Sequence, residues 1–207
     1  MKTKSIIILG PSGVGKSTVS KILADKYDFE YIDTDRIASR ELEELVKSNP
    51  KIKQKYEQCG DNLELFLDFA KHYYFVSINK ILNMCSKNIS KTYIIELGGN
   101  CFNSHKDKVF ELINILLENF TKVLLIPSEN LKESFEYLMS NSLKYDDPSS
   151  VVHPNHLLSA LKNSNFREYS DIQVFTKDKN FKEIANEIEV ETNLEKPNTT
   201  NLSLKFN

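Results

Sequence analysis

The chain has 207 residues, which suffices for one α/β domain with a continuous core, while a second full domain would be cramped. Its formal net charge of -2 at pH 7 supplies no general basic field, so a small-molecule partner is expected in place of nucleic acid or an anionic membrane. No apolar run approaches the ~20 residues of a membrane span, and the three cysteines lack C-x-x-C spacing, so we expect a cytoplasmic protein.

The first half of the chain alternates short β-branched runs with stretches of helical periodicity. In chain order, the sequence predicts a strand at 5–9, a helix at 16–26, a strand at 29–32 and helices at 36–47, 52–58 and 61–85. The last of these helices carries an aromatic stripe that includes Tyr73 and Tyr74. We interpret the stripe as core contacts, although aromatic residues at this spacing could also stack on a base.

The second half continues the alternation and ends in a polar tail. The sequence predicts a strand at 92–97, a helix at 108–119, a strand at 122–126, helices at 131–139 and 157–161, a strand at 171–176 and a helix at 181–188. Residues 140–156 are polar without clear periodicity, which predicts a mobile lid. The predicted organisation is one domain at 1–190 and a disordered tail at 191–207. Such alternation favours a parallel sheet with helices on both faces and ligands at the carboxyl ends of the strands.

Residues 10–17 read GPSGVGKS and match the pattern G-x-x-x-x-G-K-[ST] of a phosphate-binding loop between a strand and a helix. Backbone N–H groups at the start of the helix and the helix dipole would bind phosphate oxygens. Lys16 would reach the β- and γ-phosphates as a catalytic cation, and the Ser17 hydroxyl would bind Mg²⁺. The predicted nucleotide-binding residues are Ser12, Gly13, Val14, Gly15, Lys16, Ser17 and Thr18. The alternative is a tight connection followed by a solvated helix cap.

Two further turns follow predicted strands and should lie at the same edge of the sheet. At the first, Asp33 is expected to bind Mg²⁺ beside Ser17, and Asp35 to orient a substrate hydroxyl as a catalytic residue. Either carboxylate could instead cap a helix. The second turn, 98–100, reads Gly-Gly-Asn and either approaches a ligand or only reverses the chain. Glu96, inside the preceding strand, is either a partner of the metal site or bonded to neighbouring turns, and the sequence leaves both readings open.

Residues 10–35, GPSGVGKSTVSKILADKYDFEYIDTD, resemble the opening of shikimate kinases, where a phosphate loop and helix lead to a strand ending in Asp-x-Asp. Residues 94–100 (IIELGGN) and 167–176 (REYSDIQVFT) are similar to later segments of that family. The resemblance implies a P-loop NTPase three-layer fold with a five-stranded parallel sheet in the order 2-3-1-4-5, ATP and Mg²⁺ as co-substrates, Asp33 on the metal side and Asp35 at the acceptor. The expected acceptor-binding residues are Asp35, Gly98, Gly99, Asn100 and Arg167. Local likenesses to dephospho-coenzyme A kinases (32–41) and cytidylate kinases (10–13) are also present.

Departures from the family concern the acceptor. The chain's arginines are Arg36, Arg40 and Arg167, and none falls at 62–68, where the family has its acceptor-binding arginine, or in the expected lid. Lysine does not reproduce the bidentate grip of arginine on a carboxylate, so we expect a hydroxylated small molecule other than shikimate.

We therefore predict an ATP- and Mg-dependent kinase that phosphorylates a hydroxyl group of a small molecule. The competing prediction is a nucleotide-binding module or slow ATPase with a regulatory or interaction role, because loss of a transition-state arginine is costly for transfer. A regulatory GTPase is disfavoured, since the sequence contains no Asn-Lys-x-Asp motif. The sequence does not predict the oligomeric state.

Overall fold

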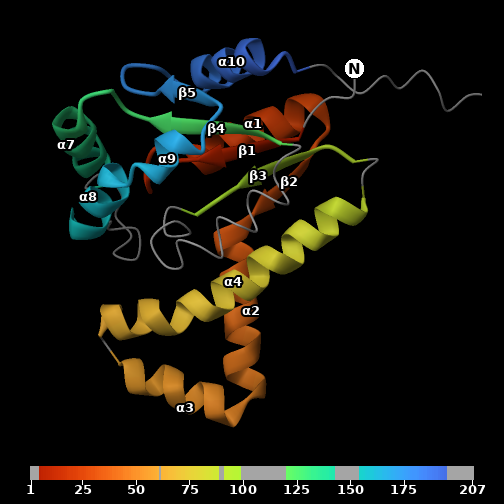
Figure 1. Cartoon of the computed structure of the whole chain (residues 1–207), viewed down its shortest axis with the longest axis vertical. Coiled ribbons are helices and arrows are strands. Elements are labelled where there is room, and N and C mark those ends of the chain that lie inside the picture. Colours follow the sequence, from red (N-terminus) through yellow and green to blue (C-terminus); the bar gives the residue numbers. More distant parts are fainter. Residues whose placement is uncertain (1–4, 61, 89–90, 99–119, 143–153, 195–207) are drawn as a thin grey trace, which may run out of the picture.

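The computed structural model describes residues 5–60, 62–88, 91–98, 120–142 and 154–194. Five parallel strands form one sheet in the order β2-β3-β1-β4-β5 (Figure 1). The strands are β1 (Ile6–Leu9), β2 (Glu30–Asp33), β3 (Tyr93–Glu96), β4 (Thr121–Ile126) and β5 (Ile172–Phe175). The predicted strands, their parallel direction and the order implied by the family resemblance are confirmed.

The centre of the sheet is apolar because β1 is covered on both faces. All four residues of β1 are buried, as expected for a central parallel strand built from branched side chains. In the pairing register, Ile8 lies beside Glu96 on one side of β3, and Asp33 lies beside Glu96 on the other. The register therefore brings Glu96, at the end of β3, between the strand before the glycine loop and the strand before the acidic turn.

Helices α1 (Lys16–Tyr27) and α10 (Phe181–Thr192) pack together on one side of the sheet (Figure 1). An ion pair between Lys26 and Glu189 (2.6 Å) joins them. The expected start of a disordered tail at residue 191 is wrong, because α10 continues through Thr192. The helix ends where Asn193 adopts a left-handed conformation and donates its N–H to carbonyl groups of the last turn. Leu194 still packs on the core, and 195–207 lie outside the described residues.

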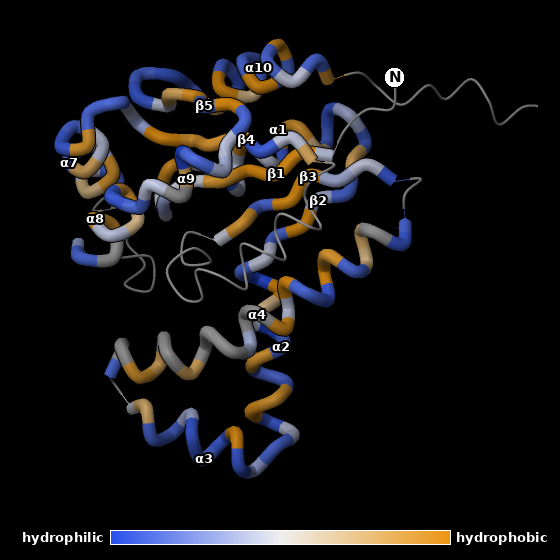
Figure 2. The backbone as a smooth tube through the Cα atoms, viewed as in Figure 1, coloured by the Kyte–Doolittle hydropathy of each residue, from blue (hydrophilic) through white to orange (hydrophobic). Residues whose placement is uncertain are grey.

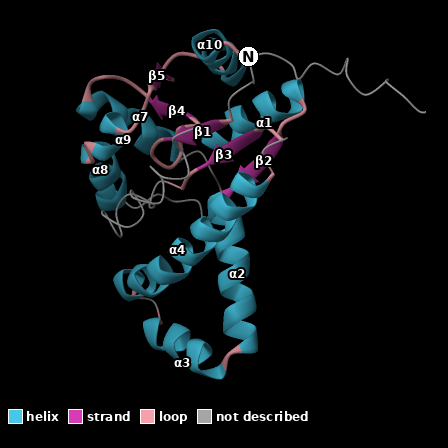
Figure 3. Cartoon of the chain, turned by 45° about the vertical axis from the view of Figure 1, so that its right-hand side comes forward, coloured by secondary structure: helices cyan, strands magenta, loops and turns pink. Residues whose placement is uncertain are grey.

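Helices α2 (Thr34–Ser48), α3 (Pro50–Cys59) and α4 (Leu63–Lys87) form an arm that projects from the sheet (Figures 1 and 3). Glu41 of α2 accepts hydrogen bonds from Ser77 (2.6 Å) and Lys80 of α4, which joins the two helices. Polar and apolar residues alternate along the arm (Figure 2), and the apolar C-terminal half of α4 contributes buried residues to the main core. The ring of Tyr73 contacts that of Phe69 one turn earlier in α4, with centroids 5.2 Å apart, and the predicted contact of the aromatic stripe with the core stays a prediction.

Helices α7 (Leu131–Ser142), α8 (Pro154–Lys162) and α9 (Asn165–Glu168) lie near the carboxyl end of β4 (Figure 1). The boundaries expected for a lid, 140–156, differ from the structure at both ends. Residues 140–142 continue α7, and α8 begins at Pro154, where a missing N–H costs little in a first helical turn. Residues 143–153 and the helix predicted at 108–119 lie outside the described residues. Within the described chain, no helix is both long and apolar enough to cross a membrane.

Candidate functional site

The predicted phosphate-binding loop connects the end of β1 to the start of α1, as expected from the motif. Its backbone takes positive φ at Gly13 (80°) and Gly15 (99°), which glycine adopts without steric strain. Gly15 is the N-cap of α1 and has no side chain that could occupy the N–H groups of the first turn. The start of α1 therefore has the geometry of an anion site. Ser12 and Thr18 are exposed beside it, and Val14 is buried.

Lys16 is buried at the first position of α1, with 7% of its surface exposed. Its Nζ donates a hydrogen bond to the carbonyl oxygen of Pro11, at 3.1 Å, so the side chain folds back over the loop. A buried ammonium group is costly unless acceptors surround it. The loop therefore holds a positive charge where the motif expects phosphate oxygens.

The carboxylate of Glu96 lies at the centre of a polar cluster beside the loop. Its Oε1 accepts a hydrogen bond from the Ser17 hydroxyl (2.8 Å), and its Oε2 accepts one from the Tyr31 hydroxyl (2.6 Å). Burial, the hydrogen bond to Glu96 and the negative charges of Glu96 and Asp33 all raise the pKa of Tyr31, so the tyrosine remains a proton donor at neutral pH. Of the two readings that the sequence left open, bonding to neighbouring elements is thus present in the structure.

The start of α2 is tied to the end of β3 by Thr34. Its hydroxyl donates to the carbonyl oxygen of Glu96 (2.9 Å) and accepts a hydrogen bond from the N–H of Gly98 (3.2 Å). The carboxylate of the next residue, Asp35, lies so close to Gly98 that a Cβ there would collide with it. The structure therefore brings Asp35 and Gly98 together, as the sequence predicted for two turns at one sheet edge.

Asp33 is the N-cap of α2. Its Oδ1 accepts a hydrogen bond from the N–H of Arg36, at 2.9 Å, which confirms the capping alternative for this residue. A carboxylate has two oxygens and several acceptor positions, so capping a helix is compatible with binding a metal. The predicted metal role of Asp33 stays a prediction.

Arg167 lies in α9, where its exposed side chain donates from Nη2 to the carbonyl oxygen of Glu129, at 3.3 Å. Glu129 belongs to the connection between β4 and α7. The arginine is thus attached to this connection, and its predicted contact with an acceptor stays a prediction. Gly99 and Asn100, which the sequence also assigned to the acceptor, lie outside the described residues.

A cavity of about 310 Å³, which the sequence does not predict, lies beside the glycine loop. Its walls are formed by Gly13 and Val14 of the loop, Tyr137 and Asn141 of α7, and Thr176, Lys179, Asn180, Phe181 and Ile184 around the start of α10. The rings of Tyr137 and Phe181 offer apolar surface suited to a planar heterocycle. The only sequence signal was the pattern of Asn180 followed three residues later by Glu183, a capping box that marks the start of α10.

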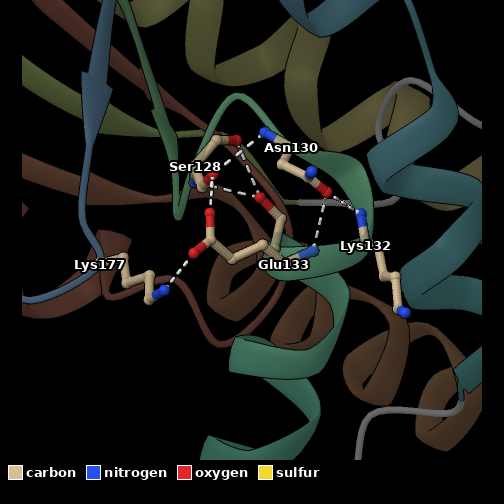
Figure 4. A network of polar contacts seen from close by, with 6 residues as sticks. Ser128, Asn130, Lys132, Glu133 and Lys177 are labelled. Atoms are coloured by element: carbon tan, nitrogen blue, oxygen red, sulfur yellow. Dashed lines mark hydrogen bonds and ion pairs between the residues drawn. The ribbon is translucent and has the colours of Figure 1, made fainter.

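Figure 4 shows the polar contacts that join the first turn of α7 to the segment after β5. Glu133, in the first turn of α7, accepts hydrogen bonds from the ammonium group of Lys177 and the hydroxyl of Ser128. These contacts, with that of Lys177 the larger, hold the pKa of Glu133 below its usual range, while the same hydrogen bond raises the pKa of Lys177. Lys177 directly follows Thr176 of the cavity wall, so the pair fixes α7 relative to the segment after β5.

Oxygen donors suited to a metal ion lie at this edge of the sheet. Among the residues that the structure describes, no group of three or more His, Cys, Asp or Glu side chains is placed to hold a metal ion by itself. The oxygens of Ser17, Asp33 and Glu96 are of the kind that Mg²⁺ prefers. Mg²⁺ is commonly bound by one or two carboxylates together with substrate phosphates, so this donor set fits a magnesium ion that arrives with a nucleotide.

Comparison with known sequences gives matches along most of the chain. The protein-family model for shikimate kinase matches residues 12–192 of this chain. The shikimate kinase of Bacillus pumilus is 28% identical over 142 residues, which are 68% of this chain and 65% of that protein. The tRNA dimethylallyltransferase of Fusobacterium nucleatum is 28% identical over 167 residues, 74% of this chain and 49% of that protein. The chain thus spans between about half and two thirds of these curated relatives.

Among solved structures, the shikimate kinase from Acinetobacter baumannii in complex with shikimate has a TM-score of 0.56 and 18% sequence identity. The match covers 93% of this chain and 94% of that one. At this identity the likeness concerns the fold, a P-loop kinase sheet with the strand order described above. The sequence model, in contrast, extends from the glycine loop to the last helix. On this evidence, the chain belongs to the shikimate kinase family.

Proposed function

We propose that this protein transfers the γ-phosphoryl group of ATP, bound with Mg²⁺, to a hydroxyl group of a small molecule. The observation that carries the proposal is the arrangement around the loop: the buried Lys16, the Ser17 hydroxyl and the cavity adjoin the same glycine turn. Phosphoryl transfer depends mainly on positioning and charge stabilisation, and these groups can supply both.

The nucleotide would lie with its phosphates at the loop and its base in the cavity. Gly13 and Val14 belong to both, so one ligand can reach from the start of α1 into the space beside Tyr137 and Phe181. The apolar faces of these two rings would contact the base. Lys16 would exchange its hydrogen bond to the loop for one to a phosphate oxygen.

Magnesium would be held by the Ser17 hydroxyl and by Asp33, together with phosphate oxygens. The bound ion supplies neutralisation of the charge on the β- and γ-phosphates. The oxygen of Asp33 that accepts the N–H of Arg36 is engaged in capping α2, so the second carboxylate oxygen, or a water on it, would face the ion.

The acceptor hydroxyl would be oriented by Asp35. Thr34, the residue before it, is hydrogen-bonded to the end of β3, so the exposed carboxylate of Asp35 starts from a fixed backbone position. Carboxylates in this role accept the hydrogen of the attacking hydroxyl. The guanidinium group of Arg167 donates to a backbone carbonyl oxygen, so it is not arranged to bind the carboxylate of an acceptor with both of its amino groups. We therefore favour sugars, cyclitols and nucleosides over an acceptor that carries a carboxylate.

The test is ADP release from ATP and Mg²⁺ in the presence of a panel of sugars, cyclitols and nucleosides. We expect release that depends on one class of acceptor and falls ~10²–10⁴-fold in Asp35→Asn, the usual range for a general base. Glu43→Gln is the matched control, because Glu43 is an exposed carboxylate on the same helix. Release that needs no acceptor and is unchanged in Asp35→Asn would favour the second candidate, a slow ATPase or nucleotide-binding module.

Lys16→Ala tests the nucleotide site shared by both candidates. Removing hydrogen bonds from a charged donor should weaken ATP binding by ~10–100-fold. Lys47→Ala removes an exposed lysine from α2 and should leave ATP affinity unchanged. Tight binding of ATP by Lys16→Ala would contradict the proposed phosphate position.

A further inference from the structure

The Ser17 hydroxyl donates its proton in a hydrogen bond to the carboxylate of Glu96. A serine hydroxyl has one proton to donate and two lone pairs with which to accept or to bind a metal. At 2.8 Å from Oε1, the proton points at the carboxylate, so the lone pairs are directed elsewhere. A hydroxyl that binds Mg²⁺ must present a lone pair, and its proton must therefore have another acceptor. Glu96 is in the position to be that acceptor.

Glu96 is held so firmly that it can orient its partner. Its backbone carbonyl oxygen accepts a hydrogen bond from the Thr34 hydroxyl, and its Oε2 accepts one from the Tyr31 hydroxyl at 2.6 Å. The residue is 7% exposed and lies at the end of β3, paired in register with Ile8 and Asp33. A carboxylate anchored on both oxygens keeps the orientation of each hydroxyl that it binds.

The charge of Glu96 is not balanced within its own contacts. In the part of the chain that the structure describes, the side-chain partners of Glu96 are two neutral hydroxyl groups, and none of the ion pairs involves it. Asp33, beside it in the register, adds a second carboxylate. Buried negative charge without a cation is costly, and two neighbouring carboxylates raise that cost. A divalent cation at this edge would relieve both.

We infer that Glu96 is the positioning residue of the magnesium site: it holds the proton of Ser17 so that the serine oxygen faces the ion, and Tyr31 holds Glu96 in place. The inference rests on the proposed function, and it adds a residue that the metal-side assignment of Ser17 and Asp33 does not contain. Glu96 acts through Ser17, because its negative charge strengthens the hydrogen bond that holds the serine proton, and it does not contact the reacting atoms. Groups that are hydrogen-bonded to a metal-binding side chain commonly set the orientation and basicity of that side chain.

Binding of ADP, measured by titration calorimetry with Mg²⁺ and with EDTA, tests the inference. In Glu96→Gln the amide oxygen can still accept from Ser17, but the negative charge is lost. We expect the gain in ADP affinity from Mg²⁺ to fall ~10–100-fold, as for other partners behind metal ligands. ADP binding in EDTA should stay the same or become tighter by about fivefold or less, because one repulsive charge near the phosphates has been removed.

Tyr31→Phe is the matched second variant, since it keeps the charge of Glu96 and removes only its anchor. It should lower the magnesium-dependent gain by less than Glu96→Gln and leave binding in EDTA unchanged. If circular dichroism and thermal unfolding show that Glu96→Gln does not fold, the Tyr31→Phe variant alone tests the inference. An unchanged magnesium-dependent gain in either folded variant would overturn the inference.

A double-mutant cycle separates action through Ser17 from a general structural effect. If Glu96 works through the serine, Glu96→Gln should add little to the loss already caused by Ser17→Ala. Fully additive losses would overturn the positioning role. Failure of the wild type to bind ADP with or without Mg²⁺ would overturn the proposed function, whereas wild-type binding with the same magnesium dependence in Glu96→Gln would overturn this inference alone.

Discussion

Replacing Gly10 with alanine should destabilise the fold, because the added Cβ would collide with the neighbouring strand. Gly10 directly follows β1, has a φ of 143°, and would place the Cβ against the carbonyl oxygen of Leu125 in β4. A backbone conformation with positive φ costs alanine roughly 1–2 kcal/mol of stability relative to glycine. Forcing extra atoms into a packed site costs a further ~1–3 kcal/mol. The combined loss of about 2–5 kcal/mol corresponds to a fall in Tm of roughly 4–20 °C for a domain of this size.

Gly60→Ala is the matched control, because alanine there also has to adopt a positive φ but its Cβ does not collide with a neighbouring strand. Gly60 has a φ of 47°, and apart from its chain neighbours no atom of the described residues lies within 4 Å of an added Cβ. This variant should lose only the backbone share, about 1–2 kcal/mol. Both variants would be compared with the wild type by thermal and urea unfolding. If Gly10→Ala is no less stable than Gly60→Ala, the argument from contact between the loop and β4 is wrong.

Three further predictions concern the arm, the cavity and the acceptor side. The hydrogen bond from Lys80 is the main cause that lowers the pKa of Glu41 below its ordinary 4.5, so Glu41→Gln should reduce stability at pH 7. That difference from the wild type should shrink as pH falls below about 4.5, in urea unfolding over a pH series. Asn180→Ala removes the capping box of α10, which should cost ~1 kcal/mol of stability and also weaken ADP binding measured by calorimetry, because Asn180 lines the cavity. Gly98→Ala should displace the carboxylate of Asp35 and raise the KM for the acceptor in steady-state assays, while ADP affinity stays unchanged.

Each of these outcomes has a result that contradicts it. A stability difference for Glu41→Gln that is the same at pH 7 and at acid pH would mean that charge is not its cause. Asn186→Ala, in the exposed middle of α10, controls for loss of an amide, and equal losses at the two positions would contradict the capping argument. An unchanged acceptor KM in Gly98→Ala would show that Asp35 does not depend on the small residue beside it.

The strands and the glycine loop could be predicted because their signals are local. A run of isoleucine and leucine before a glycine-rich turn is read within one segment of chain. The start of α2 was placed at residue 36 from apolar spacing, but the helix begins at Thr34, directly after β2. Its first turn is fixed by hydrogen bonds from Thr34 to the end of β3, and such contacts between distant segments leave no periodic pattern.

The site could be predicted where a motif marks it and not where distant segments build it. The partners of Glu96 come from the start of α1 and from β2, and only the sheet register decides that they meet. The cavity wall likewise combines Tyr137 with Phe181, neither of which belongs to a recognisable pattern. The metal-side role of Asp33 stays a prediction from its position after a strand, and the cap that it forms was one of two open alternatives until the geometry was known.

Because β1 pairs with β3 and β4, the strand before the glycine loop finds its partners late during synthesis on the ribosome. Ile6 aligns with Ile94 on one side and with Thr121 on the other, so more than half of the protein must emerge before the sheet can close around it. Long-range pairing of this kind slows folding and leaves apolar segments uncovered in the nascent chain. The anion site at the start of α1 forms only after these strands have met, so a ligand at this site can stabilise the finished protein by mass action but cannot act as a template for the earliest folding steps.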